Sequence, residues 1–572
     1  SYRASAVASW SEIHEVAGLR HSAKQVLNLR PARSQPSPGM IPDAATLSLR
    51  DAAAQCVFAR LGSNLPPKTT AEDDADRVAA LLSRTPVGGL LLFRANRASV
   101  AGVLGRLQDD APIPLLVASD VERGVGQQVE GGTLFPHAMA VGKATDPTAA
   151  AARLAQVTAR EARACGIHWA LAPVADVHVE PANPIINIRA FGTEANAVSR
   201  CTDAYVRAAQ TAGLLTTAKH FPGHGRTTAD SHATLPVVEA RRDALEAVDL
   251  APFRAAIRAG TVGVMTAHVA YPDLDPSGAP ATASSPILTD LLRGTMGFDG
   301  VVVSDSLQME GISTGADDGG PPDAGTQAAR LLRAGVDLLL DPGDPERVVT
   351  GLVDAVRRGD LEDDRVREAC GRVLALKRRL QKIRGDSAFH PFPHPSPETG
   401  EAPDGVVGAA AHRAEAAAIA RDALSADDAA RAWRATLPPQ GKGVVVQVVS
   451  AAAREETAMR LVEALRSALP QAQMQMIPPD AGGETVRTAG AEARGGTARL
   501  LVSIAEPAAW TEFGLSDSQH ALIEQEGEMP TTLTAALGSP AVMDRVSGAG
   551  RLHTYSTVPA ACTAFVEWIQ DR

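Results

Sequence analysis

The stretch DALEAVDLAPFRAAIRAGTVGVMTAH, residues 243–268, contains the structural unit that repeats along much of the chain. Its first part has apolar residues at intervals of three and four, which is typical of an amphipathic helix, and Gly260 is suited to a C-terminal cap. The run VGVMTAH (262–268) that follows is apolar until it reaches His268, which indicates a buried strand. A helix that alternates with a buried strand predicts a parallel α/β fold.

The same alternation extends from about residue 48 to 385. Its apolar runs are QCVFARL (55–61), VGGLLLF (87–93), PLLVASD (114–120), HWALAPVADV (168–177), LLTTAKH (214–220), VGVMTAH (262–268), VVVSDS (301–306) and VDLLLDP (336–342). Eight strands, each followed by a helix, predict a TIM-like (β/α)8 barrel.

Several of the predicted strands finish in polar or ionisable residues. These residues are Asp120, Asp176, Lys219 with His220, His268 and Asp305. The carboxyl ends of barrel strands ring one mouth, where active sites of this architecture lie. We therefore expect these side chains to converge on one site.

A proline-rich segment, residues 383–405, separates the barrel pattern from a second α/β pattern that begins near GVVVQVVS (443–450). The later alternation predicts a smaller αβα sandwich. The predicted division is an N-terminal extension (1–47), a barrel (48–385), a linker with a connecting helix (386–439) and the sandwich (440–572).

Composition restricts the partners that the chain can have. The 572 residues carry a formal charge of −11, with acids and bases interspersed, so we expect no nucleic-acid partner. No run approaches the roughly 20 apolar residues that span a bilayer.

The five cysteines are far apart and form no CxxC motif, which argues against a metal or redox site. Oligomeric state stays open, and so does compartment: the chain is either cytoplasmic or exported with its signal removed.

The segment KHFPGHGRTTADSH (219–232) has the densest group of reactive side chains, and it allows three interpretations. The first is that His224, between two glycines, only shapes a loop. The second is a metal site of His220, His224 and His232, against which the helix-breaking Pro222 argues. The third is a dyad in which the carboxylate of Asp230 orients the His232 imidazole for proton transfer.

Asp305 is the natural nucleophile for such a dyad, because an apolar strand delivers it to the barrel mouth. The alternative is that Asp305 caps a helix beginning near Leu307, a frequent duty of Asp at a strand-to-helix turn.

These motifs together make the family recognisable. KHFPGHG with DSH four residues later, and VVVSDSLQMEG, resemble glycoside hydrolase family 3, specifically its bacterial β-N-acetylglucosaminidase branch. The segments SDVERGVGQQVEGGTLFPHAMAVG, APVADVHVEPANPIINIRAFG and MTAHVAYPDLDPSGAPATAS follow in family order. Residues from 440 onward resemble the family's second domain in a reduced form.

The resemblance implies a role for each matching position. Asp305 matches the nucleophile, and His232 with Asp230 matches the acid/base dyad, where other family members use a Glu of the second domain. The positions matching those that bind the terminal sugar are Asp120, Arg189, Lys219 and His220. After Asp120, Arg123, Val125 and Gln128 differ from the residues that the branch usually has at these positions. These differences could change the contacts to the leaving group of the substrate.

The resemblance thus implies a retaining exo-β-N-acetylglucosaminidase that acts on cell-wall or chitin-derived oligosaccharides or muropeptides, and we expect no metal or cofactor. The enzymatic alternative is a family 3 β-glucosidase or glycoside phosphorylase of broader specificity. A catalytically inactive carbohydrate-binding barrel and a metal-dependent hydrolase are the alternatives from other classes.

Overall fold

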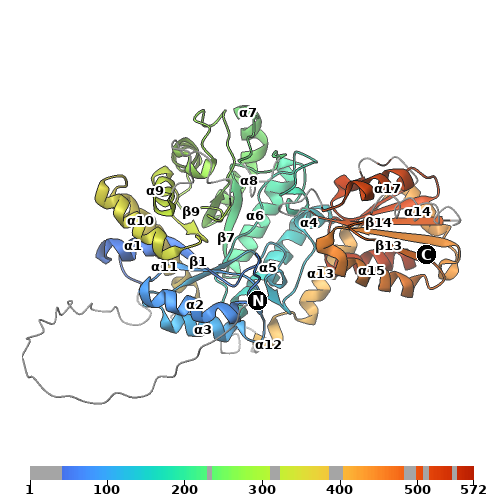
Figure 1. The fold of residues 1–572 in the computed structure, drawn as a ribbon, viewed down its shortest axis with the longest axis horizontal. Coiled ribbons are helices and arrows are strands. Elements are labelled where there is room, and N and C mark those ends of the chain that lie inside the picture. Colours follow the sequence, from blue (N-terminus) through green and yellow to red (C-terminus); the bar gives the residue numbers. More distant parts are fainter. Residues whose placement is uncertain are drawn as a thin grey trace, which may run out of the picture.

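The computed structural model describes residues 41–228, 235–309, 323–385, 389, 403–481, 498–506, 514–543, 546 and 550–571. The described residues form two large sheets, one parallel and one parallel except for its edge strand β11, and each has its own helices; the two lie side by side along the long axis of the molecule (Figure 1). The N-terminal sheet is the larger and holds the candidate site described below.

The N-terminal sheet is a parallel barrel with strand order β10-β1-β2-β4-β6-β7-β8-β9. Its strands are β1 (Val57–Leu61), β2 (Gly89–Leu92), β4 (Leu116–Ser119), β6 (Trp169–Ala170), β7 (Leu215–Phe221), β8 (Gly263–Thr266), β9 (Val301–Val303) and β10 (Leu339–Leu340). A parallel bridge between Val303 and Leu338 brings β9 beside β10 and closes the ring. All eight strands predicted from the apolar runs are present, so the predicted barrel is confirmed.

Amphipathic helices surround the barrel. They are α1 (Leu49–Gln55), α2 (Ala71–Arg84), α3 (Val100–Asp110), α4 (Ala138–Lys143), α5 (Pro147–Cys165), α6 (Ala195–Thr211), α7 (Arg242–Ala244), α8 (Leu250–Arg258), α9 (Ala324–Ala334), α10 (Pro345–Arg358) and α11 (Asp363–Arg384). Helix α5 is capped at both ends. The Asp146 side chain accepts a hydrogen bond from Ala149 N at the N-terminus, and Gly166 ends the helix in the left-handed conformation. The helix predicted over 243–260 is present as α7 and α8 joined by a π-helical turn, 245–249.

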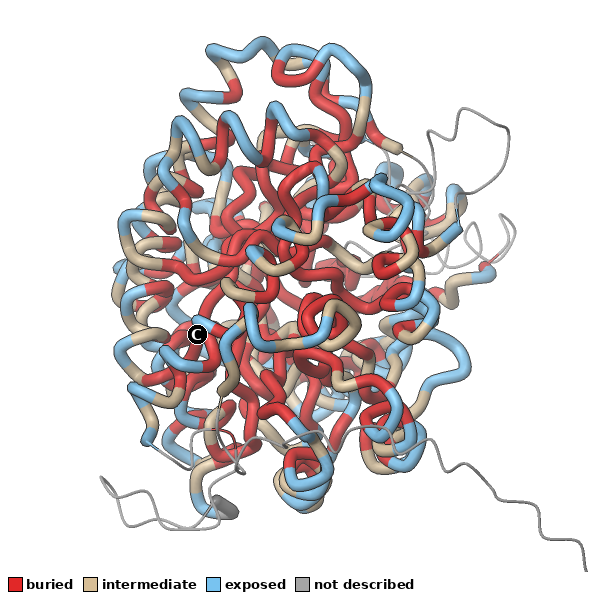
Figure 2. Tube along the Cα trace, turned by 90° about the vertical axis from the view of Figure 1, so that its left-hand side faces the viewer, coloured by how far each residue is buried: buried red, intermediate tan, exposed pale blue. Residues whose placement is uncertain are grey.

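The core of the barrel below the mouth is mostly apolar. Phe58, Trp169, Met265 and Val303 pack together inside the ring of strands. Figure 2 shows this buried interior in red, with exposed turns outside it. Two short strands, β3 (Ala95–Asn96) and β5 (Val129–Glu130), form a separate ladder next to the mouth.

The C-terminal sheet has the order β11-β16-β15-β14-β12-β13. Its strands are β11 (Ser425–Ala426), β12 (Val444–Ser450), β13 (Gln473–Ile477), β14 (Ala498–Ala505), β15 (Thr532–Gly538) and β16 (Arg551–His553). The described helices of this part are α12 (Pro403–Val406), α13 (Ala410–Ala423), α14 (Asp428–Ala435), α15 (Glu455–Ala468), α17 (Asp517–Gly527) and α18 (Pro559–Gln570).

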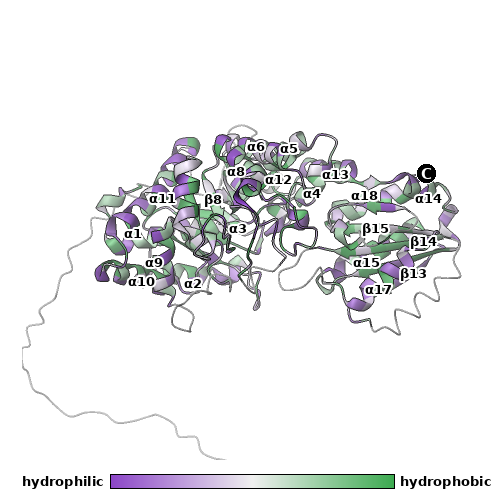
Figure 3. Cartoon of the chain, turned by 90° about the horizontal axis from the view of Figure 1, so that it is seen from above, coloured by the Kyte–Doolittle hydropathy of each residue, from purple (hydrophilic) through white to green (hydrophobic). Residues whose placement is uncertain are grey.

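Two separate apolar clusters cover the two faces of this sheet, one including α15 and α18 and the other α17. Figure 3 shows the hydrophobic strands β14 and β15 within these helical layers. A second domain with helices on both faces is what the sequence predicts.

Helix α13 connects the two sheets and packs against the barrel. Its Ala416 and Ile419 belong to the same apolar cluster as the barrel helices. The buried Glu161 of α5 accepts from Gly408 N (2.9 Å) and lies 2.8 Å from His412 Nδ1. Over the part of the chain that the structure describes, no helix is both long and apolar enough to cross a membrane.

Candidate active site

A cavity of about 550 Å³ opens at the carboxyl ends of the barrel strands. Five residues that the sequence predicts for the site line this cavity: Asp120, Arg189, Lys219, His220 and Asp305. Lys219 and His220 lie in β7 and Arg189 in the 3-10 turn 187–189, while Asp120 follows β4 and Asp305 follows β9 after one residue, so closure of the barrel brings them together. The expectation that polar strand ends converge on one mouth agrees with this arrangement.

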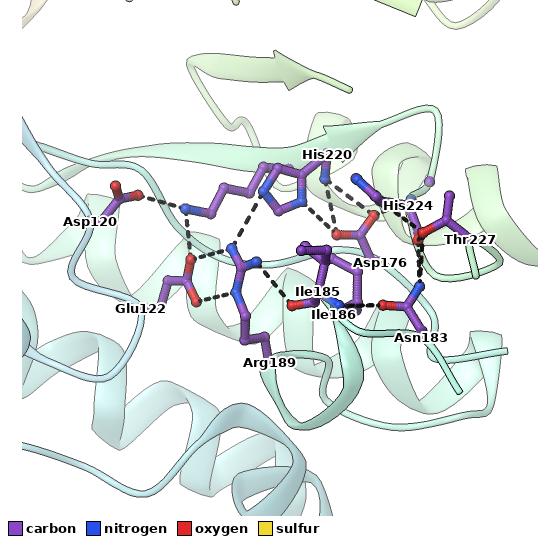
Figure 4. A network of polar contacts seen from close by, with 12 residues as sticks. Asp120, Glu122, Asp176, Asn183, Ile185, Ile186, Arg189, His220, His224 and Thr227 are labelled. Carbon is purple, nitrogen blue, oxygen red and sulfur yellow. Dashed lines mark hydrogen bonds and ion pairs between the residues drawn. The ribbon is translucent and has the colours of Figure 1, made fainter. Parts of the chain in front are cut away.

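A charged cluster occupies one side of the cavity, with Lys219 buried and Asp120, Glu122 and Arg189 partly buried (Figure 4). Lys219 Nζ lies 2.7 Å from Asp120 Oδ1 and 2.7 Å from Glu122 Oε1. Arg189 forms a two-pronged ion pair with Glu122, with Nη2–Oε1 at 2.8 Å and Nε–Oε2 at 3.1 Å. Glu122 therefore links the two cations, while Asp120 keeps an oxygen for a ligand.

These pairs favour the charged forms of Lys219, Glu122 and Arg189. Burial alone would lower the pKa of Lys219, but the Asp120 and Glu122 carboxylates outweigh burial and raise it. Burial likewise disfavours the charged form of Glu122, yet Arg189 and Lys219 hold its pKa well below the usual range. A rim of fixed charges of both signs is suited to binding the hydroxyl groups of a sugar.

Asp176 organises the next part of the mouth. It is fully buried after β6, and it accepts from the backbone N of His220 (3.2 Å) and of His224 (2.6 Å). His220 Nδ1 lies 2.8 Å from Asp176 Oδ2, which directs Nε2 toward Arg189 Nη2 at 3.4 Å. The carboxylate thus fixes the orientation of the His220 ring.

His224 lies in the cavity wall with its ring nearly perpendicular to that of His220. Burial, together with the neighbouring His220, lowers the pKa of His224 to about 4, so its ring is neutral near pH 7. Its Nδ1 lies 2.9 Å from Thr227 Oγ1, and Asn183 Nδ2 donates to its backbone oxygen (2.9 Å). These contacts agree with the loop-shaping interpretation of His224.

Asp305 lies two residues after the end of β9 and lines the cavity. Ser306 N donates to Asp305 Oδ1 at 2.8 Å. The described residues after it, up to Met309, form a turn, and α9 begins only at Ala324 with Asp323 as its cap. The described part of this connection therefore contains no helix that Asp305 could cap.

Asp230 and His232 lie outside the described residues, which end at Thr228 and resume at Leu235. The acid/base dyad therefore stays a prediction. Among the described residues, no group of three His, Cys, Asp or Glu side chains is arranged to hold a metal ion.

The second sheet contributes a residue that sequence analysis missed. Glu506 follows β14 and lines the cavity although it is almost fully buried. Thr557 Oγ1 donates to its Oε2 at 2.5 Å, His137 Nε2 lies 3.3 Å from the same oxygen, and Arg454 pairs with Oε1. Glu506 comes directly after the apolar run ARLLVSIA (498–505), as Asp120 comes directly after its own apolar run. This position could have pointed to Glu506 in the sequence.

Other cavity residues were also missed or left unassigned. Arg60, from β1, and Asp341, after β10, line the cavity beside Asp305. Of the three residues that depart from the branch pattern, Arg123 and Gln128 line the cavity. Val125 is buried in the apolar core instead.

Comparison with known proteins defines the class. The model of the glycosyl hydrolase family 3 N-terminal domain matches residues 52–376, and the chain belongs to glycoside hydrolase family 3. The resemblance found in the sequence is thereby confirmed.

Among curated relatives, β-hexosaminidase A of Pseudoalteromonas piscicida is 34% identical over 345 residues, covering 54% of this chain and 56% of the relative. The β-N-acetylglucosaminidase/β-glucosidase of Cellulomonas fimi is 36% identical over 330 residues, covering 55% and 56%. The chain thus matches little more than half the length of these two relatives. Among solved structures, a family 3 β-N-acetylglucosaminidase from Paenibacillus sp. str. FPU-7 has a TM-score of 0.76 at 30% identity and covers 92% of this chain and 97% of that one.

Proposed function

We propose that this protein is a retaining exo-β-N-acetylglucosaminidase that removes terminal β-linked N-acetylglucosamine from cell-wall or chitin-derived fragments. The observation that carries the proposal is the presence of Asp305 in one cavity with the charged cluster of Asp120, Lys219 and Arg189. Relatives named as β-hexosaminidases support the choice of sugar.

In the first step, an Asp305 carboxylate oxygen attacks the anomeric carbon as the bond from that carbon to the leaving oxygen breaks. The leaving oxygen takes a proton from His232, whose ring Asp230 orients. In the second step, water gives a proton to His232 and attacks the anomeric carbon, which releases the sugar and restores the Asp305 carboxylate.

The charged cluster holds the sugar through both steps. Asp120 accepts hydrogen bonds from hydroxyl groups, and Lys219, Arg189 and His220 donate or accept beside it. A site built from partly buried polar groups discriminates strongly, because a sugar that leaves them without hydrogen bonds loses about 1–3 kcal/mol per group.

A second candidate function rests on Glu506. A Glu from the second domain in this cavity is the feature expected of a family 3 β-glucosidase, in which such a residue would donate the proton. Against that role, both Glu506 oxygens already contact Thr557, Arg454 or His137. An ion-paired carboxylate is a poor general acid, so we favour the dyad.

Hydrolysis of nitrophenyl N-acetyl-β-glucosaminide beside the matching β-glucoside tests the proposal. We expect kcat/KM to be at least about tenfold higher for the acetamido sugar. Equal values would favour the broader β-glucosidase. Release of a sugar phosphate when inorganic phosphate is added would favour the phosphorylase.

Two substitutions separate the proton donors. His232→Ala should reduce turnover of unactivated disaccharides far more than that of nitrophenyl substrates, whose leaving groups depart without protonation. Glu506→Gln keeps the shape of its contacts and should affect both substrate types alike. The reverse result would assign proton transfer to Glu506 and overturn the dyad.

A further inference from the structure

Asp341 is a buried carboxylate in the cavity wall that the proposed mechanism does not use. It follows β10, is 1% exposed and has a φ of 55°, which is unusual for a residue other than glycine. Such a conformation persists only where surrounding contacts hold it, and it is found most often at functional sites.

The contacts of Asp341 hold the turn that follows Asp305. Ser306 Oγ donates to Asp341 Oδ2 at 2.8 Å, and Gln308 Nε2 donates to Oδ1 at 2.9 Å. Between them, Leu307 N donates to Leu340 O at 3.1 Å. Three consecutive residues after Asp305 are thus hydrogen-bonded to the end of the neighbouring strand.

Arg60 of β1 balances the charge of Asp341. Its Nε donates to Asp341 Oδ1 at 2.7 Å, and Nη2 pairs with the other oxygen. The guanidinium also lies over the Phe93 ring at 5.6 Å, which fixes it from a second side. Without Arg60, an uncompensated buried carboxylate would stand beside Asp305.

We propose that Asp341 and Arg60 form a positioning pair, which holds the turn after Asp305 in place and keeps the charge beside this nucleophile balanced. The inference rests on the proposed role of Asp305. Because a carboxylate attacks only when ionised, an unbalanced neighbouring charge changes the pH range of activity.

The test compares the pH dependence of kcat/KM for nitrophenyl N-acetyl-β-glucosaminide in two variants. Asp341→Asn leaves the Arg60 cation unpaired and favours ionised Asp305, so the acid limb should move to lower pH by about 0.5 unit or more. Arg60→Met leaves the Asp341 anion unpaired, so the acid limb should move to higher pH by about as much.

Among the described residues, the other charged or titratable groups that line the cavity with Asp305 are Asp120, Glu122, Arg123, His137, Arg189, Lys219, His220, His224 and Glu506. His268, after β8, has its Nε2 3.3 Å from the backbone oxygen of Ser306. These groups are the same in every variant. Shifts of the acid limb in opposite directions in Asp341→Asn and Arg60→Met must therefore come from the change in charge of Asp341 or Arg60. The double variant should return the acid limb to within about 0.2 unit of wild type. Its kcat should stay roughly tenfold to a hundredfold below that of the wild type, because the turn after Asp305 has lost the carboxylate that accepts its hydrogen bonds.

Asp337→Asn is a matched control. Asp337 lies just before β10, at the opposite end of the same strand from Asp341, and is equally buried and paired with arginines. It should lower thermal stability without moving the acid limb. Acid limbs that stay in place in both single variants, or that move in the same direction, would overturn the inference.

A covalent label separates this inference from the proposed function. A 5-fluoro glycosyl fluoride of N-acetylglucosamine forms its glycosyl ester faster than water releases it, and peptide mass spectrometry locates the ester. A label on Asp305 in the wild-type protein, combined with unshifted acid limbs, would overturn the positioning pair alone. A label on another residue would overturn the assignment of Asp305, and with it the pair.

Discussion

At the scale of single residues, the proposed mechanism depends on a carboxylate oxygen of Asp305 that attacks the anomeric carbon. Asp305→Asn keeps the volume and the contact with Ser306 N but cannot form the glycosyl ester, so we expect kcat to fall by at least about a thousandfold with the fold intact. Turnover of the nitrophenyl substrate and circular dichroism measure the two effects. A variant that keeps a tenth of wild-type kcat would exclude Asp305 as the nucleophile.

The neutral ring of His224 makes stability depend on pH. Its pKa is about 4 in the fold and about 6.5 in the unfolded chain, so the unfolded state binds the additional proton. The stabilisation is complete above pH 6.5 and is lost as the pH falls toward 4. By pH 4.5 the free energy of unfolding has fallen by about 2–3 kcal/mol for this reason.

His224→Gln lacks this titration. Urea unfolding at pH 7.5 and at pH 4.5 should therefore show a smaller loss of stability in His224→Gln than in wild type. Equal losses in both proteins would show that protonation of His224 is not linked to unfolding.

At the scale of elements, the polar contacts between helices α5 and α13 include one that is buried and one that is exposed. Glu161 of α5 is fully buried and accepts from Thr133 N (2.8 Å) and Gly408 N (2.9 Å), with His412 beside it. Removing it leaves buried donors unpaired, so Glu161→Ala should lower the free energy of unfolding by about 3–5 kcal/mol.

Glu415 provides the control, because it joins the same two helices on the surface, 3.5 Å from Arg153. Glu415→Ala should change the free energy of unfolding by less than about 1 kcal/mol. Similar losses in the two variants, measured by urea unfolding, would contradict the dependence on burial.

The elements were more predictable from the sequence than the site was. Each barrel strand lies within a short apolar run, and the pattern is local, so the presence and order of all eight strands could be predicted. Their bounds were predicted less well, because β6 and β10 have two residues each within the longer runs 168–177 and 336–342. The contacts of Glu122 with Arg189, 67 residues later, and of Arg60 with Asp341, 281 residues later, exist only after the barrel has closed. Local periodicity contains no information about such pairs.

At the scale of the whole molecule, the contacts of α13 bear on where the barrel unit ends. We propose division near residues 385 and 440, yet Val407, Ala416 and Ile419 lie in the barrel's apolar cluster. A chain ending at Leu424 should therefore be more stable than one ending at Arg384 by at least about 3 kcal/mol. Urea unfolding of both chains measures the difference.

Both truncated chains retain Asp305 and the segment that contains Asp230 and His232. Both should therefore cleave the nitrophenyl substrate if they fold, although neither contains Glu506. A folded chain of either length without activity would show that a residue beyond Leu424 is essential, with Glu506 the first to examine.

The cluster of Asp120, Lys219 and Arg189 also has a consequence for how the protein matures. Lys219 is 99 residues away from Asp120 in the chain, and the two meet only when β4, β6 and β7 are in register. If the cluster binds sugar as we propose, a partly collapsed chain cannot bind it, and binding appears only after these long-range contacts have formed. N-acetylglucosamine added during refolding should consequently slow later unfolding without accelerating the early collapse, because it binds the finished barrel alone.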